Sequence, residues 1–221
     1  RAWGNWTYTP GMGGTLDPGT STVVFGQTYH TISGSHSLNH VIFDPNTGAA
    51  PEQTIAAGTT LTVLGNLTLD NTNDTGYTRV IGTGTIAVHG NVLIDGTANK
   101  TDPVANGATL SLVGTNNQTL DAQGTLDDGH VIINKPSGTV TLLRNFNQSS
   151  VSIDQNVTVT SGTLDLSGYT LSIDGTLTNN GTIIASGVGT PIAAGTLTGN
   201  ATSLVRYTGN AVLPDTFQDR A

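Results

Sequence analysis

A triplet made of an apolar, a small polar and an apolar residue recurs along the chain. Alternate residues of a β-strand point to opposite faces, so each triplet sends two apolar side chains to one face and one polar side chain to the other. The pattern predicts many short strands, each with one buried face. The triplets are Leu61-Thr62-Val63, Leu67-Thr68-Leu69, Ile86-Ala87-Val88, Leu110-Ser111-Leu112, Val140-Thr141-Leu142, Val151-Ser152-Ile153, Val157-Thr158-Val159, Leu164-Asp165-Leu166 and Leu171-Ser172-Ile173.

The spacing of the triplets indicates how the strands are arranged. Several triplets begin six or seven residues apart, as at Val157, Leu164 and Leu171, and glycine at the intervals suits tight corners. In a parallel β-helix, three faces of roughly seven residues make a coil of about 21 residues. In an antiparallel β-sandwich, each Asp-Gly or Ser-Gly would be a hairpin turn. Strands of about three to five residues are short for a sandwich, so we predict an all-β parallel β-helix, with the sandwich as the alternative.

A longer repeat divides the chain. Residues 21–43 align with residues 108–133, and a third copy begins at residue 203. We therefore expect a cap or association segment over 1–20, a first solenoid unit over 21–107, a second over 108–202 and the start of a third over 203–221. A unit that stops partway predicts truncation from a larger array or completion by another molecule, because solenoid units contact mainly their neighbours.

Three stretches depart from the triplet rhythm. Residues 70–79 and 97–107 are polar and rich in turn-forming residues, which predicts loops that project from the coil. Residues 49–57 are the best candidate for a helix, because Pro51 would occupy its first turn.

Composition and charge exclude several classes of function. The 221 residues include 15 acidic and 7 basic side chains, a net charge of −8, and no basic stripe, which argues against nucleic acid as a partner. No apolar run is long enough to span a membrane. Cysteine is absent, which excludes disulfides and thiolate metal sites.

Three stretches of sequence carry a resemblance to a known class of protein. They are Gly14 to Phe25 (GTLDPGTSTVVF), Ala57 to Thr68 (AGTTLTVLGNLT) and Ser161 to Leu171 (SGTLDLSGYTL). The pattern resembles large secreted bacterial β-solenoid repeat proteins, which include the filamentous-haemagglutinin-like and autotransporter-type adhesins. The resemblance covers nearly the whole chain, but its motifs are degenerate.

The resemblance implies a right-handed coil and a structural or adhesive role outside the cell, at the bacterial surface. Together with the incomplete third unit, it leads us to expect head-to-tail self-association into a filament, or a place within a longer stalk. The alternatives are a module that binds surface glycans and a carbohydrate-active β-helix enzyme. No catalytic residue is carried over, and we expect that the chain is not an enzyme.

Two metal hypotheses arise. Asp70, Thr72 and Asp74 alternate along one loop and offer oxygen ligands that could hold Ca²⁺, an ion that secreted β-solenoids often use; the alternative is a solvated turn. Imidazole is a common ligand of transition metals, but His40 and His130 share one position of the long repeat, which favours a structural role. The five histidines are His30, His36, His40, His89 and His130.

An acidic cluster near Gln123 is the strongest candidate for catalysis. Asp121, Asp127 and Asp128 could supply the paired carboxylates of a glycosidase. Such a site would usually need a basic partner or an aromatic platform for the sugar, and the sequence shows neither beside the cluster.

Aromatic and asparagine side chains suggest two further roles. Trp3, Trp6 and Tyr8 could cap the first coil or form an association surface, and Tyr207 at the start of the third unit is assigned to association as well. Asparagine recurs next to Ser and Thr and is predicted to form stacked side-chain ladders at the corners of the coil.

Overall fold

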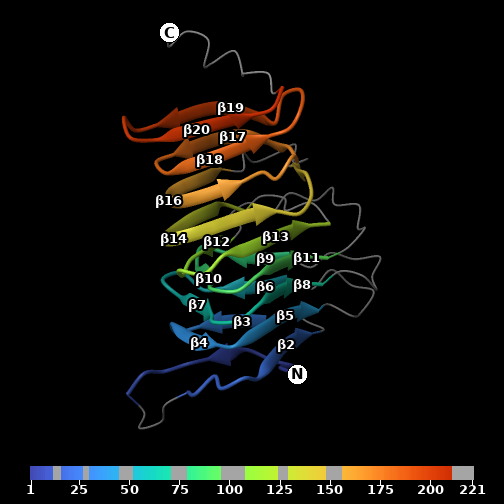
Figure 1. The fold of residues 1–221 in the computed structure, drawn as a ribbon. Helices are drawn as coiled ribbons and strands as arrows, with labels where there is room; N and C mark the ends of the chain where they lie inside the picture. The colour runs from blue at the N-terminus through green and yellow to red at the C-terminus, as the bar shows by residue number, and fades with distance from the viewer. Residues whose placement is uncertain are drawn as a thin grey trace.

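The protein is a β-solenoid in which parallel strands stack in about seven turns (Figure 1). The computed structural model describes residues 1–11, 16–26, 30–44, 52–70, 79–95, 108–123, 129–147 and 156–210. Within these residues there is no helix and every strand pairing is parallel. The prediction of a parallel β-helix is therefore confirmed, and the antiparallel sandwich is wrong.

The strands form rows that run along the axis of the coil. The β1–β9 row contains β1 (Trp6–Thr7), β3 (His30–Ser33), β6 (Glu52–Ile55) and β9 (Arg79–Gly82). The β4–β19 row begins with β4 (His36–Leu38), β7 (Thr60–Val63), β10 (Thr85–Val88) and β12 (Thr109–Leu112). The β2–β20 row begins with β2 (Thr22–Gly26), β5 (His40–Asp44), β8 (Leu67–Leu69), β11 (Val92–Ile94) and β13 (Gln118–Ala122).

Longer strands pass from one row to the next in the C-terminal half. The first halves of β14 (Val131–Leu142) and β16 (Val157–Asp165) extend the β4–β19 row, and their second halves extend the β2–β20 row. The second halves of β17 (Leu171–Asn179) and β19 (Ile192–Gly199) then complete the β4–β19 row. The β2–β20 row ends with β18 (Thr182–Ser186) and β20 (Leu204–Thr208), while β15 (Phe146–Asn147) pairs with the first half of β17.

The turns are close to the expected size. The separation between paired residues of neighbouring turns ranges from 18 residues for Thr22 and His40 to 28 residues for Val92 and Leu120. Strands β6, β7 and β8 make the three sides of one turn, and β9, β10 and β11 those of the next. The division at residues 107/108 and 202/203 stays a prediction, although the segments 21–25 and 108–112, which the long repeat aligns, fall in different rows.

The core consists of the apolar ends of the triplets. Leu61 and Val63 of β7 are fully buried between the equivalent residues of β4 and β10. All the triplets lie in strands except that Leu166 directly follows β16 and that residues 151–153 are outside the described residues. Leu69 is half-buried rather than fully buried.

Two predictions of local structure are wrong. The helix over 49–57 does not form, because Glu52–Ile55 is strand β6, paired with β3 and β9. Strands also exceed five residues in the C-terminal half, where β14 has 12 residues. The backbone turns corners at Gly138 and Gly162, whose φ angles of 82° and 83° are open to glycine without steric cost. The predicted loops lie largely in segments 71–78 and 96–107, outside the described residues.

Candidate functional site

The corner between the β4–β19 and β2–β20 rows is held by a ladder of side chains. The backbone N–H of Asn66 donates to Nδ1 of His40, that of Asn91 to Oδ1 of Asn66, and that of Thr119 to Oδ1 of Asn91, each at 2.9 Å. Asn117 accepts the N–H of Thr139 at 3.0 Å in the same manner. The predicted asparagine ladder is thus present, and His40 serves it as a structural acceptor.

A buried polar network lies inside this corner. Gln118 donates to the carbonyl oxygens of Val88 and Gly90 in the preceding turn, at 2.9 and 2.5 Å. Lys135 reaches back from the next turn, and its Nζ donates to Oε1 of Gln118 at 2.5 Å and to the carbonyl of Val113 at 3.3 Å. Burial lowers the pKa of the Lys135 ammonium because it removes the charge from water. Sequence analysis missed this network, which joins three successive turns.

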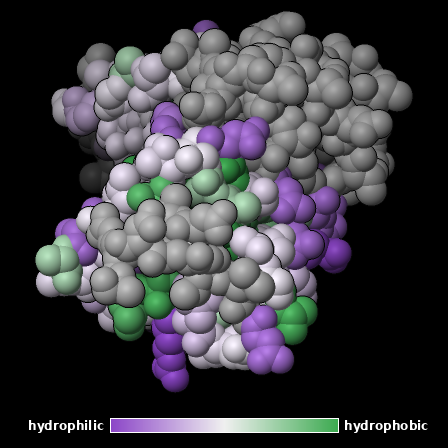
Figure 2. All heavy atoms as spheres, turned by 90° about the horizontal axis from the view of Figure 1, so that it is seen from above, coloured by the Kyte–Doolittle hydropathy of each residue, from purple (hydrophilic) through white to green (hydrophobic). Residues whose placement is uncertain are grey.

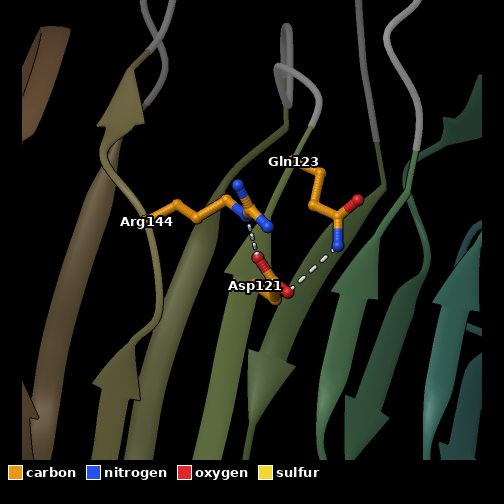
Figure 3. Close-up of polar contacts among 3 residues, drawn as sticks. All are labelled: Asp121, Gln123 and Arg144. Carbon is orange, nitrogen blue, oxygen red and sulfur yellow. Dashed lines mark hydrogen bonds and ion pairs between the residues drawn. The ribbon is translucent and has the colours of Figure 1, made fainter.

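A second polar cluster lies on the outer surface, at the end of β13 (Figure 3). The carboxylate of Asp121 accepts a hydrogen bond from Nε of Arg144 at 2.9 Å and another from Nε2 of Gln123 at 3.2 Å. The Arg144 side chain is 57% exposed and that of Asp121 is 20% exposed. The structure therefore supplies the basic partner of Asp121 that was not evident from the sequence.

The enzymatic hypothesis stays a prediction. Asp127 and Asp128 lie outside the described residues, so the paired carboxylates are not observed. Asp121 itself is ion-paired on an open surface, a common structural arrangement. The signal that could have found Arg144 is its separation of 23 residues from Asp121, which is one turn of the coil.

Acidic side chains recur at the C-terminal ends of successive strands in the β2–β20 row. One of them is Asp70, the first ligand in the calcium hypothesis. The backbone N–H of Asp70 donates to the carbonyl of Phe43, and that of Asp95 to the carbonyl of Leu69, so Asp44, Asp70 and Asp95 stack in register. Asp44 also forms an ion pair with Arg1 at 2.9 Å. Thr72 and Asp74 lie outside the described residues. In the part of the chain that the structure describes, no three His, Asp or Glu side chains are grouped to hold a metal ion.

The remaining histidines are dispersed over several turns. His30 is buried, and its Nε2 lies 2.8 Å from the carbonyl of Gly26. His36 is buried with Nδ1 2.6 Å from the carbonyl of Gly34. His89 and His130 are exposed. The structure does not bring the five together, and the transition-metal hypothesis stays without support.

Aromatic rings close the N-terminal end of the core. The Trp6 ring meets Phe25 edge-on with centroids 5.7 Å apart and stacks on His36 at 6.2 Å. Tyr8 lies 5.5 Å from His36. Trp3, in contrast, is 56% exposed and lies 6.0 Å from the guanidinium of Arg1. Trp6 and Tyr8 therefore cap the coil, which leaves Trp3 as the exposed aromatic of this end.

The opposite end of the described coil is less enclosed. Leu197, Val205 and Tyr207 pack on the core but are only half-buried, and Leu204 is 51% exposed. Figure 2, which looks onto this end, shows hydrophobic side chains around its centre and hydrophilic ones near its margin. Burial raises the pKa of the Tyr207 hydroxyl, since the ionised form would lose hydration.

Comparison with known proteins does not assign the chain to a family: no family model, curated protein or solved structure matches it. Among the described residues, no helix is both long enough and apolar enough to cross a membrane.

Proposed function

We propose that this protein is a structural, adhesive β-solenoid of a bacterial exterior whose copies associate head to tail. The observation that carries the proposal is the difference between its two ends. The N-terminal end is closed by Trp6 and Tyr8 and exposes Trp3. At the other end, β19 and β20 have strand partners on one side only among the described residues.

The geometry of the last turn among the described residues favours a second copy as its partner. The N–H of Leu204 donates to the carbonyl of Gly181 in the preceding turn, so the next residue, Val205, directs its backbone groups away from β18, while Val205 and Tyr207 are both half-buried. Their half-buried side chains would be covered by another turn placed in register. A contact between two different ends of identical chains does not close on itself and therefore produces a filament.

The test uses the whole chain with two matched variants. Tyr207→Lys places a charge at the end of the core, whereas Tyr169→Lys places one on the side wall, where Tyr169 is 37% exposed. We expect wild type and Tyr169→Lys to form filaments by light scattering and negative-stain microscopy, and Tyr207→Lys to stay monomeric with unchanged circular dichroism. A wild type that stays monomeric at millimolar concentration would contradict the proposal, and so would filaments of Tyr207→Lys.

A further inference from the structure

The outer surface of the β4–β19 row carries hydroxyl groups in two parallel columns. In the first column, Thr85 pairs with Thr60 on one side and with Thr109 on the other, and Thr176 pairs with Thr196 farther along. In Figure 1, strands β4, β7 and β10 of this row lie one above another. The second column stands two residues along each strand and contains Ser37, Thr62, Thr158, Thr178 and Thr198, together with Ser111, which is buried.

The columns form a two-dimensional lattice, which we call the threonine face. Neighbouring strands of a sheet lie about 4.8 Å apart, and side chains two residues apart along a strand are separated by about 6.6 Å. The parallel pairing keeps register from β4 to the second half of β19 at these positions. Since threonine is β-branched and stiff at χ1, the hydroxyl and methyl groups are held in place before any partner binds.

The threonine face contains no Asp, Glu, Lys or Arg, although the chain carries a net charge of −8. One column is interrupted at Ala87, at the buried Ser111 and at Ile132, and the other at His130 and Asn156. The neighbouring β2–β20 row presents Asp121, Asp165 and Arg206 at its outward positions. The difference in charge therefore favours an uncharged, flat and periodic partner for the threonine face.

We propose that the threonine face binds the surface of ice. The surface of ice is uncharged and is ordered in two dimensions. Its water molecules offer both hydrogen-bond donors and acceptors, which is what a hydroxyl group requires of a partner. Threonine also places a methyl group beside each hydroxyl, and this apolar surface is released from liquid water on contact. A crystalline polysaccharide fits less well, because sugar rings stack on aromatic side chains and both columns lack Trp, Tyr and Phe.

Thr62 and Thr68 provide a matched pair for the test. Both are half-buried middle residues of consecutive triplets in one turn, but Thr62 lies on the threonine face and Thr68 on the β2–β20 row. Lysine at either position adds the same charge to a strand of the same kind. Melting temperatures measured by circular dichroism establish that both variants are folded.

The experiment measures thermal hysteresis and ice-crystal shape for the whole protein. We expect wild type and Thr68→Lys to shape ice, and Thr62→Lys to lose at least about threefold in hysteresis at equal concentration, because contact would dehydrate the ammonium. Failure of wild type to shape ice would overturn the proposal, as would an equal loss in both variants or retention on crystalline cellulose without effect on ice. Monomeric protein suffices for this assay, so its outcome is independent of filament formation.

Discussion

Lys135 is a buried cation, and among the residues that the structure describes its only side-chain partner is the neutral amide of Gln118. An amide lowers the penalty of burying an ammonium without neutralising its charge. Lys135 and Gln118 are 17 residues apart in the sequence, and their hydrogen bond joins two turns of the coil. The stability of this corner should therefore depend on the protonation state of one amine.

The pH dependence of stability should follow from Lys135. Its folded pKa lies below the ordinary value of 10.5, so over the interval between them the unfolded chain binds more protons than the folded one. Stability should consequently rise with pH through that interval. Lys135→Met should lack this rise, so the melting temperature of wild type should increase relative to that of Lys135→Met as pH rises toward 10.5. A difference that stays constant with pH would contradict the assignment.

Gly90 illustrates how closely the corners of successive turns approach. A Cβ at Gly90 would lie 2.4 Å from the carbonyl oxygen of Gly65, whereas one at Gly4 would meet nothing within 4 Å. Gly90→Ala should destabilise the fold by about 1–3 kcal/mol through overpacking, and Gly4→Ala should be nearly neutral. Urea denaturation of the two variants measures this difference. Equal midpoints would show that the corner can relax.

At the scale of the element, the ladder of His40, Asn66 and Asn91 fixes the path of the chain between two strands, as hydrogen-bonded turns do in other β proteins. Each asparagine side chain accepts a backbone N–H from the following turn, so the corner pairs with its neighbour much as strands do. This arrangement lets the strand register pass from one side of the coil to the next. A turn by itself would accept Gly, Ser or Asp at these positions as well. The bond to the next turn explains why asparagine recurs there.

The ladder should stabilise the coil in measurable increments. Asn91→Ala removes the acceptor of the Thr119 N–H and should lower the free energy of unfolding by about 0.5–1.5 kcal/mol. Asn116→Ala is the control, since Asn116 is exposed and stands outside the ladder. Thermal unfolding of both variants checks the prediction. It would be refuted if Asn116→Ala were destabilised as strongly as Asn91→Ala.

For the whole molecule, charge should govern end-to-end association. Each copy carries a net charge of −8, so bringing copies together in a filament raises their mutual repulsion. Salt screens this repulsion, with a Debye length of about 10 Å at 0.1 M. The concentration at which light scattering begins to rise should therefore fall as NaCl increases. A rise in that concentration would indicate that attraction between charges, rather than stacking of the core, joins the ends.

The amino-acid sequence alone was enough to establish the class of fold. A period of two within each triplet and a spacing of six or seven between several triplets predict short strands with one buried face, and the shortness of the strands favoured the coil over the antiparallel sandwich. The alternation also marked the core, as Leu61 and Val63 show. The same pattern appears in every turn, so it could not show where strands continue around a corner, as β14 does.

Only the tertiary structure decided which distant residues meet. Arg144 reaches Asp121, Lys135 reaches Gln118, and the threonine columns align because backbone pairing keeps register between turns that range in length from 18 to 28 residues. An irregular turn length is invisible to a search for a fixed repeat. The coil is thus specified locally by hydrophobic periodicity, whereas its polar network and its outer surfaces depend on the register that backbone pairing sets between turns.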